Sequence, residues 1–187
     1  DLELVLWSFP NDRKMATLPE ATEPERFASM ILPKLIAAHL GDGWQILDTA
    51  SQVMHYVGEH TCTVKMSVDL SHPLKNGLQT LTLFDKTYYN EEGAETDRVM
   101  RQLWDSESRL IGRLALAKPL GYDTQAKTLW QLAVPGITLE TCDIDHPEFF
   151  PFLREAAGAI GALHRTPVSG ARSVTSADLI SNLKSVT

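Results

Sequence analysis

Residues 79–104 read QTLTLFDKTYYNEEGAETDRVMRQLW, and this stretch decides the fold that we predict. Its first half alternates apolar with polar residues, which indicates a strand that delivers Lys86 near its end. A short acidic turn with a glycine follows, and 92–104 then repeats apolar residues at helical spacing. The stretch therefore predicts a strand carrying Lys86 and, directly after it, a helix whose first turn carries Glu95.

Lys86 offers a compact positive charge with three hydrogen-bond donors, which suits the oxygens of a polyphosphate. A lysine in such a site needs a carboxylate to hold it in place, and Glu95 is within reach on the next helix. Taken alone, a lysine near a strand end is more often a solvated side chain. A polyphosphate-binding role for Lys86 and Glu95 is therefore expected only if the rest of the chain predicts a matching fold.

The rest of the chain predicts an α+β fold with a five-stranded antiparallel sheet. The strands expected for the sheet are 44–57, 62–70, 78–88, 114–117 and 128–134. Helices are expected at 22–40, which Pro33 should kink or split in two, at 92–104 and at 146–164. A short strand at 2–9 and a short helix at 176–183 complete the prediction. One helix, 92–104, should cross the sheet.

The Val134-Pro135-Gly136 break divides mainly strand-forming sequence from mainly helical sequence. We expect three parts: a strand-helix extension over 1–43, a sheet lobe over 44–136 and a helical segment over 137–187. The extension has two open roles, as a cap that shapes an acceptor site or as a dimer contact.

Composition narrows the classes of function. The 187 residues are 43% hydrophobic and carry a net charge of −7, so a core can form and a broad nucleic-acid surface is not expected. No apolar run approaches the roughly 20 residues that span a bilayer, and no signal peptide is visible, so we expect a cytoplasmic protein without membrane contact. Cys62 and Cys142 read as ordinary buried thiols, and the histidines lack metal-ligand spacing.

The order of these elements resembles the N-terminal lobe of the aminoglycoside phosphotransferase and choline kinase-like family, which has a protein kinase-like fold. The resemblance covers about 44–167 and rests on six segments in order. They are VMHYVGEHTCTVKM (53–66), LFDKTYY (83–89), GAETDRVMRQLW (93–104), LALAKPLGYD (114–123), LWQLAVPGITLE (129–140) and AAGAIGALHRTPV (156–168).

The resemblance implies a set of nucleotide contacts. Lys86 would sit on the α- and β-phosphates of ATP, Glu95 would pair with it, and the turn around Gly58 would lie over the phosphates. The hinge that reads the adenine edge would consist of Gln131, Leu132, Ala133 and Val134. The cofactor implied is ATP with Mg²⁺, and the partners are this nucleotide and an unknown small-molecule acceptor.

The sequence departs from the family pattern in two ways. The turn has one glycine and no GxGxxG motif. The His-Gly-Asp catalytic loop with its later Asn is also missing, since Asp178 and Asn182 lack that context. We therefore predict no catalytic residue and no metal ligand within this chain, and we expect a fragment of a longer phosphotransferase that is inactive alone. The alternative is a non-catalytic kinase-like binding or regulatory module.

Overall fold

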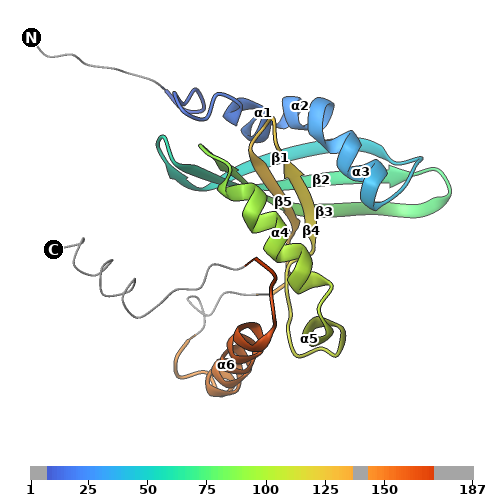
Figure 1. Cartoon of the computed structure of the whole chain (residues 1–187). Coiled ribbons are helices and arrows are strands. Elements are labelled where there is room, and N and C mark those ends of the chain that lie inside the picture. Colours follow the sequence, from blue (N-terminus) through green and yellow to red (C-terminus); the bar gives the residue numbers. More distant parts are fainter. Residues whose placement is uncertain (1–7, 137–142, 171–187) are drawn as a thin grey trace, which may run out of the picture.

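The strand and the helix of the opening stretch are both present, as β3 (Lys75–Tyr88) and α4 (Glu92–Trp104) (Figure 1). The computed structural model describes residues 8–136 and 143–170. The expected strand at 2–9 lies almost wholly outside these residues, and the expected helix at 176–183 and Cys142 lie entirely outside them. The boundaries predicted for α4 are confirmed at both ends.

The sheet has five strands in the order β1-β2-β3-β5-β4, and every neighbouring pair is antiparallel. The other strands are β1 (Gln45–Val57), β2 (Thr61–His72), β4 (Pro119–Asp123) and β5 (Thr128–Leu132). The predicted α+β fold with a five-stranded antiparallel sheet is therefore confirmed.

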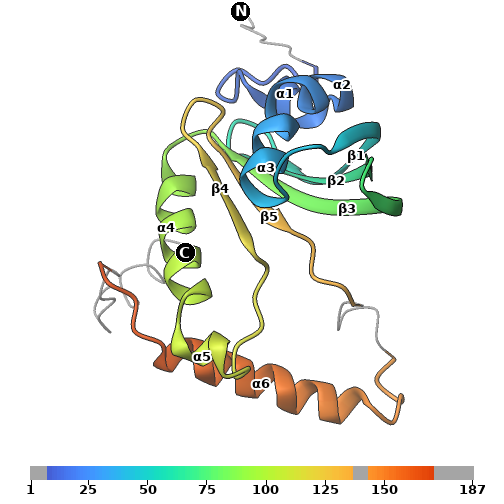
Figure 2. The same cartoon turned by 90° about the vertical axis from the view of Figure 1, so that its right-hand side faces the viewer.

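The core lies between one face of this sheet and a helical layer built from the N-terminal residues (Figure 2). β2 alternates strictly, and its apolar side supplies Cys62, Val64, Met66, Val68 and Leu70, all fully buried. Burial raises the pKa of the Cys62 thiol to about 12, so this cysteine is an inert core residue.

The helical layer consists of α1 (Leu18–Thr22), α2 (Pro24–Arg26), the π-helical turn η1 (Phe27–Ile31) and α3 (Leu32–His39). The helix predicted over 22–40, which Pro33 was expected to kink or split in two, starts earlier than predicted and is irregular next to Pro33. The layer begins earlier, at Leu18, and Pro33 lies in the first turn of α3, directly after η1. The irregularity is the π-helical turn just before it.

The opposite face of the sheet carries α4, which packs on β3, β4 and β5. Gly93 permits this close approach. A Cβ at this position would lie 2.4 Å from Cε2 of Tyr122 and 2.8 Å from Cδ2 of Tyr88. Gly93, which has no side chain, therefore lets the first turn of α4 pack directly against the sheet.

The strand expected at 114–117 is wrong, because β4 lies later in the chain. The sequence predicts a turn at Gly121-Tyr122-Asp123 between the two expected strands, but these residues belong to β4. The reversal occurs after it: Asp123 Oδ1 accepts the N–H groups of Gln125 and Ala126, and Lys127 takes a left-handed φ of 50°. Asp123 is the last residue of the strand, and its side chain caps the turn that follows. From the sequence alone, such an aspartate looks the same as one in the middle of a turn.

Beyond the sheet, α5 (Glu107–Leu110) and α6 (Phe149–Arg165) lie away from the core (Figure 2). The chain after α6 returns to α4, where Ser169 N–H donates to Oε1 of Gln102 at 2.7 Å. Within α6, all of whose residues are described, only Ala162 is buried, so the predicted helix forms with its apolar stripe exposed.

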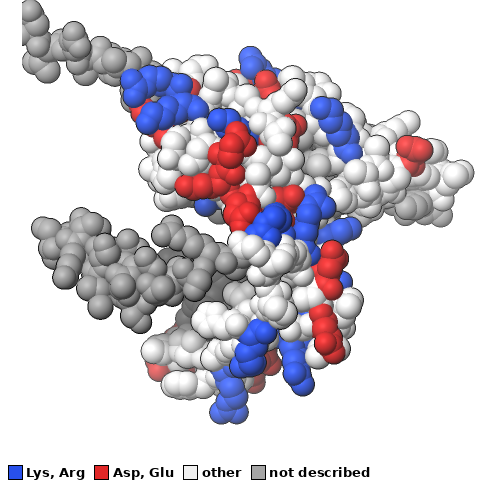
Figure 3. All heavy atoms as spheres, viewed as in Figure 1, with Lys and Arg blue, Asp and Glu red and all other residues white. Residues whose placement is uncertain are grey.

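Two further observations concern the surface charge and the helices of the described chain. Acidic and basic side chains are interspersed on the face shown in Figure 3, rather than gathered by sign. In the described ranges, none of the helices combines the length and the apolar character that crossing a bilayer requires.

Candidate ligand cavity at Lys86

A cavity of about 260 Å³ lies between the sheet and α4. Residues of β2, β3, α4 and β5 line it: Thr63, Phe84, Asp85, Lys86, Tyr88, Thr96, Met100, Leu129 and Gln131. The wall of the cavity is mainly apolar, although five of these nine residues carry a polar or charged side chain. Such a composition is typical of a small-molecule site.

The register of the sheet explains why these side chains meet. Phe84, Lys86 and Tyr88 alternate along β3, so they point to the face that α4 covers. Lys86 lies opposite Thr63 of β2 on one side and opposite Leu129 of β5 on the other. The lysine therefore occupies the middle of a row that crosses three strands, with a helix above it.

The ammonium group of Lys86 lies 5.1 Å from the centre of the Tyr88 ring. A cation over a ring face is attracted by the quadrupole of the ring but keeps its charge. Within the described ranges, no carboxylate forms an ion pair with Lys86. Its three donors therefore remain available to an anionic ligand.

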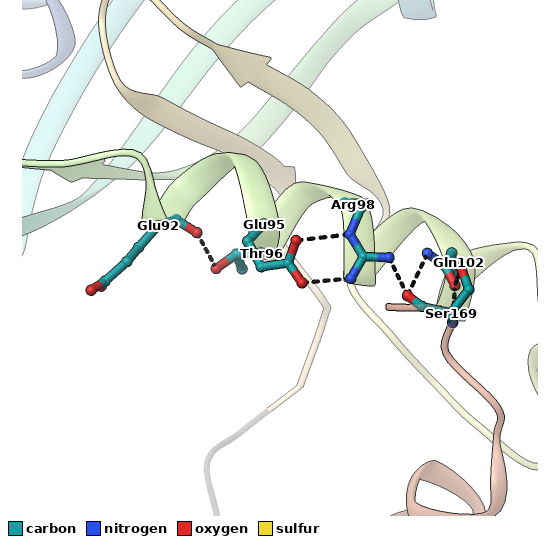
Figure 4. A network of polar contacts seen from close by, with 6 residues as sticks. All are labelled: Glu92, Glu95, Thr96, Arg98, Gln102 and Ser169. Atoms are coloured by element: carbon teal, nitrogen blue, oxygen red, sulfur yellow. Dashed lines mark hydrogen bonds and ion pairs between the residues drawn. The ribbon is translucent and has the colours of Figure 1, made fainter. Parts of the chain in front are cut away.

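Glu95, the partner that the sequence indicates for Lys86, bonds elsewhere in this structure (Figure 4). Its carboxylate accepts hydrogen bonds from Nε and Nη2 of Arg98, and these bonds hold the pKa of Glu95 below its usual value. The side chain is 59% exposed. The structure therefore does not bring Glu95 to Lys86.

The rotation of α4 accounts for this difference. Thr96 and Met100 point into the cavity, and residues one position apart on a helix are about 100° apart around its axis. Glu95 precedes Thr96, so it lies on the side of the helix that carries Arg98. Thr96 and Met100 are cavity residues that the sequence analysis missed, although their spacing of four places them on one helical face.

The segment predicted as a hinge is partly engaged in the sheet. The N–H of Leu132 donates to Lys118 O at 3.0 Å, and the N–H of Ala133 donates to Thr82 O at 2.9 Å. Gln131 lines the cavity, and Val134 is exposed. A ligand edge at this segment would therefore bind backbone groups other than these two amides.

The turn between β1 and β2 borders the cavity but differs from the expectation for Gly58. Glu59, not the glycine, takes the left-handed conformation, with φ of 60°. Thr61 follows this turn and pairs with Tyr88, which lines the cavity. Two amides of the turn are already bonded: Glu59 N–H to Asp12, and His60 N–H to Val57 O.

Asp85 borders the cavity, but its side chain lies on the opposite face of β3, which faces the core. Asp85 is 1% exposed, and neither of its carboxyl oxygens has a hydrogen-bond partner among the described residues. Burial raises the pKa of Asp85 well above its usual value. It lies opposite Trp130, whose Nε1 also lacks a partner in the described chain. The alternation of β3 already puts Asp85 on the apolar side with Leu83.

The described residues contain no cluster of three or more His, Cys, Asp or Glu side chains that could hold a metal ion. These residues fit a nucleotide with Mg²⁺ only in part: Lys86 offers donors that a phosphate could use, and no metal ligands are found in the described ranges. Comparisons with protein-family models, with curated proteins and with solved structures find no match to this chain.

Proposed function

We propose that this chain is the nucleotide-binding portion of a small-molecule phosphotransferase that uses ATP to phosphorylate a hydroxyl group. The observation that carries the proposal is the position of Lys86, whose unpaired ammonium lies in a mostly apolar cavity. Of the described residues that line this cavity, it is the one with a basic side chain. The ligand should therefore combine a flat apolar ring with an anionic group.

The size of the cavity supports a part of a nucleotide. Sites for small molecules usually measure about 300–1,000 Å³, and this cavity holds about 260 Å³. That volume suits one ring with its nearest phosphate better than a complete nucleotide with an acceptor. The sheet order, with a helix between β3 and β4, also agrees with the element order on which the resemblance to the phosphotransferase family rests.

In this proposal the chain binds and orients the nucleotide but carries out no bond-breaking step. Lys86 would hold phosphate oxygens, and Phe84, Met100 and Leu129 would contact the ring. ATP with Mg²⁺ is the cofactor that the proposal implies. The Mg²⁺ ligands and the catalytic base would come from outside this chain.

A second function, a non-catalytic kinase-like binding or regulatory module, is favoured by a different observation. Glu95 is bonded to Arg98, and the amides of Leu132 and Ala133 are bonded within the sheet. Three groups that the resemblance assigns to nucleotide binding are thus already engaged. A module of this kind would bind nucleotide weakly or not at all.

Isothermal titration calorimetry with ATP and Mg²⁺ on this chain and on Lys86→Met tests the proposal. Hydrogen bonds to a charged group contribute about 1.5–3 kcal/mol, so the substitution should weaken binding about tenfold or more. Lys65→Met is the matched control, because Lys65 lies opposite Phe84 but does not line the cavity. No binding by the unmodified chain would reject nucleotide binding and leave the regulatory module. Equal affinities of all three proteins would reject the Lys86 cavity as the nucleotide site.

A further inference from the structure

Asp12 lies just before the helical layer and is 4% exposed. Its Oδ1 accepts the backbone N–H groups of Lys14 at 2.8 Å and Met15 at 3.1 Å. Its Oδ2 accepts the hydroxyl of Tyr56 and the N–H of Glu59, each at 2.8 Å. Since an ionised carboxylate is an acceptor on both oxygens, one buried side chain ties the N-terminal segment to β1 and to the turn that follows it.

The neighbouring ion pairs reinforce this attachment only weakly. The carboxylate of Glu59 lies 2.8 Å from Nη2 of Arg13 and 3.3 Å from Nζ of Lys14. Both cations are about half exposed, at 58% and 49%, and exposed ion pairs contribute little because water screens them. The buried bonds of Asp12 are therefore the main restraint on the turn.

The turn needs such a restraint. Glu59 has a φ of 60°, a left-handed conformation that is unfavourable for a residue with a side chain. Its N–H points to Asp12, so the bond and the conformation depend on each other. Without this acceptor, the chain between Tyr56 and Thr61 would relax toward conformations that a glutamate prefers.

The turn is close enough to the cavity for its position to matter there. Thr61, at the end of the turn, pairs with Tyr88, and the next residue of β2 on the same face, Thr63, pairs with Lys86. Tyr88, Thr63 and Lys86 all line the cavity. The turn thus borders the end of the cavity at which Lys86 lies over the Tyr88 ring.

We propose that Asp12 is a positioning residue for the anionic part of the cavity ligand, because it holds the β1–β2 turn at the Tyr88 end of the cavity. This role rests on the proposed nucleotide binding. The N-terminal segment then supports the β1–β2 turn, which is a role different from the cap and the dimer contact that the sequence left open. Burial raises the pKa of Asp12, but the hydrogen bonds from Glu59, Tyr56, Lys14 and Met15 outweigh it, so the carboxylate is charged at neutral pH.

Calorimetric titration of the full chain with ATP and Mg²⁺, and separately with adenosine, tests this role. Asp12→Asn puts an amide donor among the groups that now donate to Asp12. It should weaken ATP binding at least fivefold and leave adenosine binding unchanged. Tyr56→Phe removes one bond to Asp12 and keeps the other three, so it should give a smaller loss of the same kind and serves if Asp12→Asn does not fold. Arg13→Gln, which removes only the exposed ion pair, should stay within twofold.

The outcomes separate this role from the proposed function. If ATP binding depends on Lys86 but is the same in Asp12→Asn and Tyr56→Phe, the positioning role is wrong and the proposed function stands. An equal loss of ATP and adenosine affinity also rejects it, because that result reflects general destabilisation. If the unmodified chain binds neither compound, the proposed function fails and the positioning role fails with it.

Discussion

Glu95 bonds to Arg98, three residues further along the same helix, and does not bond to Lys86 across the cavity. Arg98 also donates to the carbonyl of Ser169, in the chain that follows α6 (Figure 4). The carboxylate that the sequence indicates as the anchor of Lys86 is therefore tied to the junction between α4 and α6. Lys86 is held instead over the ring of Tyr88.

The first prediction concerns this glutamate. Glu95→Gln should leave the affinity for ATP within twofold, because the side chain does not reach the cavity. The free energy of unfolding should hardly change, since the ion pair with Arg98 is exposed and screened by water. Calorimetric titration and urea denaturation measure both quantities. A tenfold loss of affinity would contradict the prediction and would mean that Glu95 turns toward Lys86 when ligand binds.

The second prediction concerns the buried carboxyl of Asp85 and the pH dependence of stability. Its pKa in the folded chain is raised by burial, while in the unfolded chain it should lie near the ordinary value of about 3.9. The folded state therefore binds a proton that the unfolded state releases. The contribution of Asp85 to stability is fully present below about pH 4 and is lost as pH rises toward the folded pKa.

Asp85→Asn removes this titration and keeps the shape of the side chain. The variant should gain stability over the unmodified chain as pH rises from about 4, by about 1.4 kcal/mol for each unit that separates the folded and unfolded pKa values. Urea denaturation at a series of pH values gives the difference between the two proteins. A difference that does not change with pH would show that Asp85 is ionised in the folded chain.

The third prediction uses one glycine of α4, Gly93, and one glycine of α6, Gly158. Gly93→Ala should destabilise the chain by about 1–3 kcal/mol, because the new Cβ would overlap the rings of Tyr122 and Tyr88. Gly158→Ala is the matched control, since a Cβ at this position meets no atom within 4 Å. It should stabilise α6 by up to about 1 kcal/mol through helix propensity.

Thermal and urea denaturation of the two alanine variants measure this contrast. Because Tyr88 lines the cavity, Gly93→Ala should also weaken ATP binding, whereas Gly158→Ala should not. Equal effects of the two substitutions on stability would contradict the close packing of α4 against the sheet.

The sequence by itself was sufficient for the elements whose periodicity is strong. The strict alternation of β2 and the helical repeat of 92–104 predict both elements, because burial on one face requires these patterns. The same alternation places Lys86 and Asp85 on opposite faces of β3. The strand predicted at 114–117 was wrong because the turn signal of Gly121 and Asp123 is local, whereas strand pairing with β5 decides where β4 begins.

Tertiary structure alone decided which side chain of α4 faces Lys86. The helical pattern allows Glu95 or Thr96 to face the sheet, and the choice depends on the rotation of the helix about its axis. That rotation is set by contacts of Gly93 with Tyr88 and Tyr122, residues on two strands that flank α4 in the chain. The sequence determined that a lysine strand and a glutamate helix would be neighbours, and packing decided that their charges would not meet.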